Sequence, residues 1–208
     1  MQKLLAFFIF SIVVLLAVAV SADELTAGVR TGSKAPDFEL QTYDGKTIKL
    51  SDFIGKTVVL EWVNPNCPFV KRHYKSGNMP KLQEEYLAKG VVWLGINSTA
   101  KGHGDYLTIE RAEDFVTTYG VKSSALLNDS SGAVGKLYGA KTTPHLFIVD
   151  PQGVLRYQGA VDDDSGFFGN PLSARNYVRE ALNALLEAKA VATSDTKPYG
   201  CSVKYAAS

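Results

Sequence analysis

Residues 58–74 read VVLEWVNPNCPFVKRHY, an apolar run that is followed by a turn and a Cys-Pro step. The run from Val58 to Val63 is almost continuously apolar, which is typical of a central strand buried on both faces. Pro68 fits the first position of a helix, because its ring fixes φ and its missing N–H would have no partner there. The segment therefore predicts a strand, a turn and a helix that opens at the Cys-Pro step.

Cys67 lies at the start of this predicted helix, where a reactive thiol is expected. The free N–H groups in the first turn of a helix favour an anion, so this place stabilises the thiolate form of a cysteine. The alternative is a small buried side chain, since free cysteines are often core residues. Polar neighbours and the position after a strand favour the reactive interpretation. The chain has one other cysteine, Cys201, near its far end.

The composition describes one globular domain with additions at its ends. The 208 residues are 46% hydrophobic and 21% charged, enough to bury a full core. The formal net charge is +1 and no basic block is present. Charge therefore gives no reason to expect nucleic acid or an anionic membrane surface as a partner.

The first 22 residues have the pattern of a secretory signal peptide. Lys3 precedes an apolar run, and small residues stand before Asp23. The run of about 17 residues is at the lower edge of what spans a bilayer, so an uncleaved anchor is the alternative. We expect export to the periplasm or beyond, where disulfides persist. The predicted organisation is a signal peptide (1–22), one domain (23–190) and a tail carrying Cys201 (191–208).

Strand and helix patterns alternate along the predicted domain. Residues 35–40 and 46–50 alternate apolar and polar side chains around Asp44-Gly45, which predicts a hairpin. Further strands are predicted at residues 57–63, 91–97, 126–128, 146–149 and 154–159. Helices are predicted at residues 68–89 with a break at 77–80, at 109–119 capped by Thr108, at 132–139, and at 173–188 capped by Ser173.

This order of elements predicts the fold class and the place of the site. Strands separated by helices, then a strand hairpin and a last helix, predict an α/β sandwich around a mixed sheet. Cys67 then lies just beyond the C-terminal end of the first central strand, where open α/β sheets have their sites.

Several segments resemble the thioredoxin-fold superfamily, and within it the redoxin group of peroxiredoxins and exported thioredoxin-like reductases. They are Ala35-Pro-Asp-Phe38, Leu50-Ser-Asp-Phe53, the stretch around Cys67, Thr142-Thr-Pro144-His145 and Phe147–Gly153. Asn66–Val70 together with the tail Gly200–Tyr205 resembles a peroxiredoxin-like, AhpC/TSA-type branch. The resemblance implies a thioredoxin-like sandwich with an N-terminal hairpin extension, thiol chemistry and no cofactor.

The resemblance also implies roles for individual residues. Cys67 matches the nucleophilic cysteine, and Pro144 matches the cis-proline that packs beside it. Glu61 matches the buried acid of thioredoxins, which moves protons during disulfide exchange. A carboxylate inside an apolar strand would have its pKa raised by burial and could act as a general base. The alternative is a partly exposed strand residue paired with a lysine.

Two departures from the family patterns limit the expected activity. Position 70 is Val, so the local Cys-x-x-Cys pair of thioredoxin-type reductases is missing. Asn64 stands where peroxiredoxins carry the Thr or Ser that orients the peroxide, although its amide could still donate to a bound oxygen. We expect a thiol oxidoreductase that leans toward peroxiredoxin-like antioxidant chemistry. Its partners would be a peroxide, or a protein thiol or disulfide, and a reducing thiol.

Cys201 decides the mechanism and leaves several alternatives open. If the tail folds back over the site, Cys201 can resolve a sulfenic acid or a mixed disulfide on Cys67. It could instead form a static staple with Cys67, bond to another chain or stay free. In a copper-binding alternative, both cysteines would converge with His73 and His145, although His73 is more often a surface residue. A redoxin without catalysis is a further alternative, and the acidic run Asp162–Asp164 is interpreted as a solvated loop.

Overall fold

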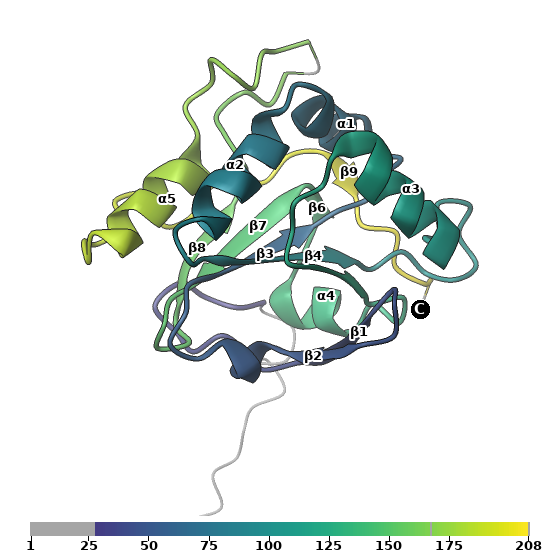
Figure 1. Cartoon of the computed structure of the whole chain (residues 1–208), viewed down its shortest axis with the longest axis horizontal. Coiled ribbons are helices and arrows are strands. Elements are labelled where there is room, and N and C mark those ends of the chain that lie inside the picture. Colours follow the sequence, from purple (N-terminus) through teal and green to yellow (C-terminus); the bar gives the residue numbers. More distant parts are fainter. Residues whose placement is uncertain (1–27, 167, 208) are drawn as a thin grey trace, which may run out of the picture.

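The computed structural model describes residues 28–166 and 168–207, and the expected signal peptide lies outside them. A seven-stranded mixed sheet forms the centre, with helices on both faces (Figure 1). Its strands are β1 (Glu39–Thr42), β2 (Thr47–Lys49), β3 (Val58–Trp62), β4 (Val92–Asn97), β5 (Ala125–Asn128), β7 (His145–Val149) and β8 (Leu155–Gly159). The expected α/β sandwich is confirmed. Within the described ranges, no helix is long and apolar enough to cross a membrane.

The strand order is β2-β1-β5-β4-β3-β7-β8, which puts the Cys67 strand inside the sheet. Strand β3 pairs in parallel with β4 and antiparallel with β7. All five residues of β3 are buried, as the continuous apolar run predicts for a strand covered on both faces. The hairpin prediction is also confirmed, because β1 and β2 pair antiparallel.

The helices are α1 (Pro68–Lys75), α2 (Asn78–Leu87), α3 (Ile109–Tyr119), α4 (Ala133–Tyr138) and α5 (Tyr177–Leu186), with a 3-10 helix η2 (Leu50–Phe53). The predicted break between α1 and α2 is at Gly77, whose φ of 77° suits glycine. Thr108 caps α3 as expected. The predicted cap at Ser173 is wrong, because Ser173 closes a local turn and the Asn176 side chain caps α5.

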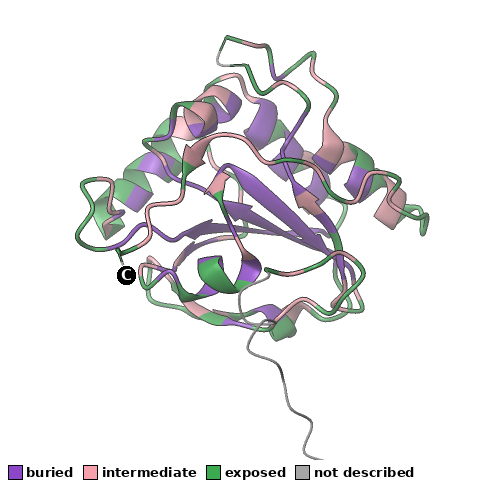
Figure 2. Cartoon of the chain, turned by 180° about the vertical axis from the view of Figure 1, so that it is seen from behind, coloured by how far each residue is buried: buried purple, intermediate pink, exposed green. Residues whose placement is uncertain are grey.

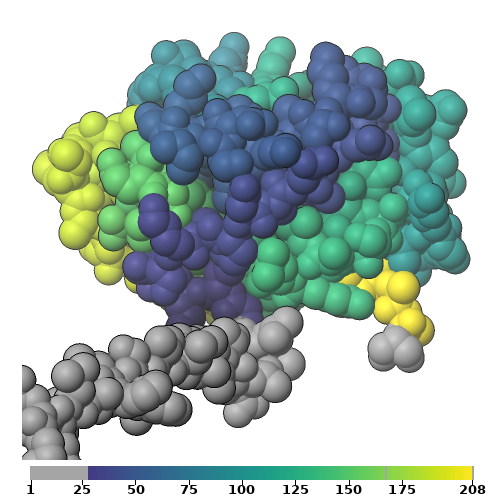
Figure 3. Space-filling model, turned by 90° about the horizontal axis from the view of Figure 1, so that it is seen from below, coloured from purple at the N-terminus to yellow at the C-terminus, as the bar shows by residue number. Residues whose placement is uncertain are grey.

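Each face of the sheet has its own hydrophobic core. Helices α1, α2, α3 and α5 pack on the face that includes Val59, Trp93 and Leu146. Helix α4, Phe38 and Leu50 pack on the other. Figure 2 shows the sheet as the most continuously buried part of the chain. Seen from below, the first described residues, in purple and blue, spread over one surface of the domain (Figure 3).

A second, two-stranded sheet was not predicted from the sequence. Strand β6 (Thr142–Thr143) pairs antiparallel with β9 (Cys201–Ser202) in the tail. This pairing returns the tail to the C-terminal end of β3 (Figure 1).

Candidate active site

Cys67 is the N-cap residue of α1, and Pro68 follows it at the first helical position. Its backbone N–H donates to the carbonyl of Asn64 at 3.0 Å, which closes the turn after β3. The Cys67 residue is only 2% exposed and belongs to the core cluster beneath α1. The thiol therefore lies at the start of a helix, as predicted, but it is buried from solvent.

The cover comes from the segment around Pro144. The Thr143–Pro144 peptide bond is cis, as the resemblance implied. The Cys67 thiol donates to the carbonyl oxygen of Thr143, with 3.0 Å between Sγ and O. The Thr143 hydroxyl is buried and has no hydrogen-bond partner among the described residues. The residue before the proline therefore contacts the thiol directly.

Cys201 is carried to the same place by the end of the chain, residues 199–205, which we call the strap. Cys201 pairs with Thr143 across the β6–β9 ladder. The backbone N–H of Val203 donates to Lys141 at 3.1 Å, and that of Ala100 donates to Lys204 at 2.8 Å. The strap thus crosses the site and occupies the backbone edge of β6.

The two thiols are neighbours in this arrangement, and both are free. Burial raises the pKa of the Cys201 thiol to about 12, and the hydrogen bond and charge of Cys67 add to the shift. Cys201 is therefore protonated at neutral pH and donates toward Cys67. The two thiols therefore differ in setting: Cys67 lies at the start of a helix, and Cys201 is held in its protonated form.

Glu61 lies on β3 and is completely buried. It accepts hydrogen bonds from the Trp93 indole at 2.8 Å, the Tyr74 hydroxyl at 3.0 Å and the Gln83 amide at 3.2 Å. Burial raises the pKa of Glu61 to about 7, against the lowering effect of these donors. The alternative of an exposed residue paired with a lysine is wrong. Tyr74 belongs to α1, so Glu61 is joined to the helix that Cys67 begins.

Asn64 has structural partners in the turn that presents Cys67. Its amide nitrogen donates to Asp105 at 3.3 Å, and its oxygen accepts the backbone N–H of Asn66 at 2.9 Å. The Asn66 side chain donates to the other oxygen of Asp105 at 2.9 Å. These bonds tie the turn to the loop before α3. Donation from Asn64 to a bound oxygen stays a prediction.

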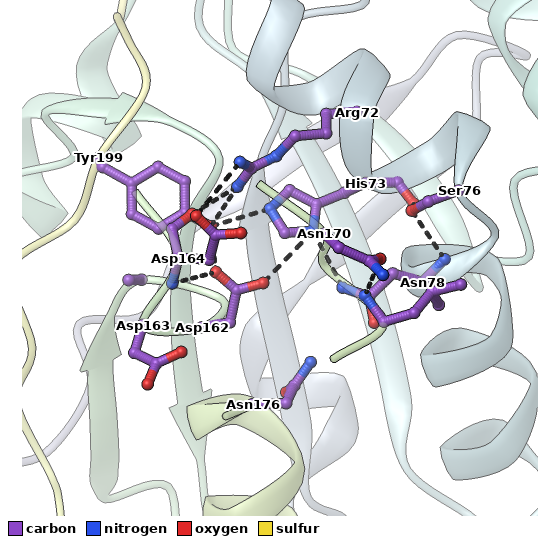
Figure 4. A network of polar contacts seen from close by, with 12 residues as sticks. Arg72, His73, Ser76, Asn78, Asp162, Asp163, Asp164, Asn170, Asn176 and Tyr199 are labelled. Carbon is purple, nitrogen blue, oxygen red and sulfur yellow. Dashed lines mark hydrogen bonds and ion pairs between the residues drawn. The ribbon is translucent and has the colours of Figure 1, made fainter. Parts of the chain in front are cut away.

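A polar network at the other end of α1 was missed by sequence reasoning (Figure 4). It joins Arg72 and His73 of α1 to Asp162 and to Tyr199 of the strap. The expectation of a solvated acidic loop is wrong for Asp162, which is 1% exposed because the Tyr199 ring and α1 cover it. The surface interpretation of His73 is wrong as well, since its side chain is fully buried. The sequence signal that pointed to this network was the position of Tyr199, two residues before Cys201.

The four donors of the copper-binding alternative do not form one cluster. Among the described residues, no group of three or more His, Cys, Asp or Glu side chains could hold a metal ion. His73 contacts Tyr199 and Asn78, and the His145 ring accepts the backbone N–H of Lys141 at 3.3 Å. The two histidines of the copper alternative are therefore engaged with other residues, while the two cysteines lie beside each other.

Comparison with known proteins places this geometry in a family. The family model described as AhpC/TSA family matches residues 31–158. Thioredoxin-like protein YneN of Bacillus subtilis is 30% identical over 62% of this chain and 71% of its own length. Thiol-disulfide oxidoreductase ResA of Halalkalibacterium halodurans is 29% identical over 61% of this chain and 66% of its own length. A crystal structure of the hypothetical protein SMc02350 from Sinorhizobium meliloti has a TM-score of 0.75 at 28% identity, covering 87% of this chain and 97% of that one.

Proposed function

The chain belongs to the AhpC/TSA family, and on that premise we propose that it is a two-cysteine thiol–disulfide oxidoreductase. Cys67 is the nucleophile and Cys201 is the resolving cysteine of the same chain. The observation that carries the proposal is the pairing of Cys201 with Thr143, the residue whose carbonyl accepts the Cys67 thiol. Sequence relatives named thiol-disulfide oxidoreductases support the reaction class.

The reaction transfers two electrons from the two thiols to the substrate. The Cys67 thiolate attacks one sulfur of a substrate disulfide, the substrate S–S bond breaks, and the first substrate thiolate leaves. Cys201 then loses its proton and attacks the Cys67 sulfur. The mixed disulfide breaks, the second substrate thiolate leaves and a Cys67–Cys201 disulfide remains. An external dithiol resets the protein by the reverse exchange.

Glu61 is the proton acceptor that we propose for this exchange. Cys201 is protonated at neutral pH because burial and its neighbour raise its pKa to about 12. A base must therefore take up a proton during the second step. The carboxyl of Glu61, with a pKa near 7, can accept and return a proton in the physiological range. Its connection to α1 runs through Tyr74.

Reduction of hydrogen peroxide is the second candidate, and the cover over Cys67 favours it. The thiol is 2% exposed, and the strap pairs with the edge of β6, so a small oxidant needs less opening than an extended peptide. The buried Thr143 hydroxyl is a donor with no partner among the described residues. In this reaction Cys67 becomes a sulfenic acid, the O–O bond breaks and water forms. Attack by Cys201 releases the second water.

Export and the further partners follow from the sequence pattern and are part of the proposal. Residues 1–22 would direct the chain out of the cytoplasm, and residues 23–190 would form the domain with residues 191–208 as its tail. An oxidising compartment would allow the Cys67–Cys201 disulfide to persist between turnovers. The reductant would be a partner with its own dithiol.

Stopped-flow oxidation of the reduced protein separates the two candidates. Wild type and Cys201→Ser are mixed in turn with oxidised glutathione and with hydrogen peroxide, and the products are identified by mass spectrometry. We expect a Cys67–Cys201 disulfide in wild type and a Cys67–glutathione adduct in the variant. Rapid sulfenic acid formation with peroxide would make the protein a peroxidase. Reaction with both oxidants at the rate of a free thiol would overturn the proposal, and Cys67→Ser is the background control.

A further inference from the structure

Tyr199 is the hub of the buried polar network at the C-terminal end of α1 (Figure 4). Its hydroxyl oxygen lies 3.0 Å from Nε2 of His73 and 3.2 Å from Nη2 of Arg72. The same hydroxyl donates to Oδ1 of Asp162. Its ring packs against Phe69 with 5.8 Å between centroids. A tail residue is therefore surrounded by side chains of the helix that carries the nucleophile.

The partners of Tyr199 fix the direction of each hydrogen bond. The amide nitrogen of Asn78 can only donate, and it lies 2.9 Å from Nδ1 of His73. Nδ1 is then the acceptor, and Nε2 carries the proton that is donated to Tyr199. Burial lowers the pKa of His73 to about 3, so the ring is neutral at physiological pH. The phenol thus accepts from His73 and Arg72 and donates to Asp162.

Removal of the Tyr199 hydroxyl would take one hydrogen bond from each of Arg72, His73 and Asp162. His73 is fully buried and Asp162 is 1% exposed. Among the residues that the structure describes, the Asp162 Oδ2 atom and the Arg72 Nε atom already have no hydrogen-bond partner. Buried polar groups that lose a partner destabilise the arrangement that holds them. The network is therefore complete only while the strap is docked.

We propose that Tyr199 is a positioning residue, clamped by Arg72, His73 and Asp162, that holds Cys201 beside Cys67 for the resolving step. The inference rests on the proposed two-cysteine reaction. Cys201 is two residues from Tyr199, and Cys67 begins the helix that provides Arg72 and His73. The clamp thus fixes the positions of both sulfur atoms relative to α1. Its effect is a high effective concentration of the Cys201 thiol at the Cys67 sulfur.

Tyr205 provides a matched control on the other side of Cys201. Its hydroxyl donates to the carbonyl of Ala140 at 2.8 Å, and its ring lies against Gly132. Neither partner belongs to α1. Tyr205→Phe therefore removes one hydrogen bond of the strap without touching the clamp.

The test measures the two chemical steps separately in Tyr199→Phe, Tyr205→Phe and wild type. Oxidised glutathione is the probe, and quenched samples are resolved by mass spectrometry into the Cys67 adduct and the internal disulfide. For Tyr199→Phe we expect the second step to slow about tenfold or more, with the first step changed less than about twofold. The Tyr205→Phe protein should resolve its adduct at close to the wild-type rate.

Hydrogen exchange of backbone amides gives an independent readout that does not depend on the thiol–disulfide reaction. In reduced Tyr199→Phe, the amide of Val203 should exchange faster while the amides of β3 keep their wild-type protection. A wild-type second-step rate and unchanged exchange in a folded Tyr199→Phe protein would overturn the clamp and leave the proposed function intact. Equal slowing of both steps would also overturn it. A wild-type protein that forms no internal disulfide would overturn the proposed function itself.

Discussion

The two cysteines lie in regions of very different construction. Cys67 follows a strand whose residues are all buried, and it belongs to the main core cluster. Cys201 lies on a two-residue strand, and every residue of the strap is only half-buried or exposed. The scaffold is held by apolar packing, whereas the strap is held by backbone pairs and by the contacts of Tyr199. The segment that carries Cys67 is therefore fixed by the core, whereas the strap that carries Cys201 can open locally without unfolding of the domain.

A movable strap is consistent with the demands of the reaction. An oxidant must reach a thiol that is 2% exposed, and the cover must then return with Cys201. Segments with few buried contacts open locally at a low free-energy cost, without unfolding of the domain. The scaffold and the strap should therefore respond differently to matched changes.

The largest effect is expected when either cysteine is replaced by serine. Cys67→Ser should abolish reaction with oxidised glutathione, because the attacking thiolate is gone. Cys201→Ser should keep the first step and accumulate the adduct, because only resolution is lost. Single-turnover kinetics with mass spectrometry measure both. An equal loss of the first step in the two variants would contradict the separate roles of Cys67 in attack and of Cys201 in resolution.

The next effect concerns Glu61 and has a characteristic pH dependence. The carboxylate must be ionised to accept a proton, so the resolving rate in wild type should rise as pH increases through about 7. Glu61→Gln keeps a hydrogen-bond acceptor but cannot ionise, and we expect it to lose this rise and about a hundredfold in rate. A pH–rate profile of the second step is the measurement. A rise near pH 7 that persists in the variant would contradict the role.

Stability should show the opposite pH trend, since ionised Glu61 is buried. The pKa is about 7 in the folded protein against 4.5 as the ordinary value. Between these values the folded state binds more protons than the unfolded state, so the free energy of unfolding falls as pH rises from about 4.5 through 7. Urea unfolding of wild type and Glu61→Gln at a series of pH values tests this, and the variant should have the flatter profile.

The smallest effect comes from a matched pair of valines. Val59 is fully buried in β3, and Val59→Ala should lower the free energy of unfolding by about 2 kcal/mol. Val203 is half-buried in the strap, and Val203→Ala should cost less than about 0.5 kcal/mol. The strap variant should instead make Cys67 more reactive toward a small thiol reagent. Equal losses of stability would mean that the strap is part of the cooperative scaffold.

The parts of the fold and of the site that could be predicted are those with local signals in the sequence. The buried strand at 58–63, the helix that opens at Cys67 and the helix capped by Thr108 all carry periodicity or capping residues within a few positions. The raised pKa of Glu61 followed from its place inside an apolar strand. The failed cap at Ser173 had the right residue type, but the helix starts after Asn176, whose side chain accepts the backbone N–H of Arg179.

The strap and its clamp could not be derived in the same way. The pairing of Thr143 with Cys201 depends on two strands of two residues each, too short to give a pattern. The bond between Arg72 and Tyr199 joins residues 127 positions apart. Asp162 begins an acidic run that reads as solvated, and its cover comes from α1 and the tail, which are both distant from it in the sequence. These contacts exist because three distant segments meet, which a single sequence does not reveal.

Oxidation is expected to join Cys67 to Cys201 within one chain. The most direct measurement mixes equal amounts of isotope-labelled and unlabelled reduced protein, oxidises the mixture with oxidised glutathione, and maps the disulfide-linked peptides by mass spectrometry. We predict Cys67–Cys201 peptide pairs in which both halves are labelled or both are unlabelled. Pairs that combine one labelled and one unlabelled half at the statistical ratio, or no Cys67–Cys201 linkage at all, would contradict the account.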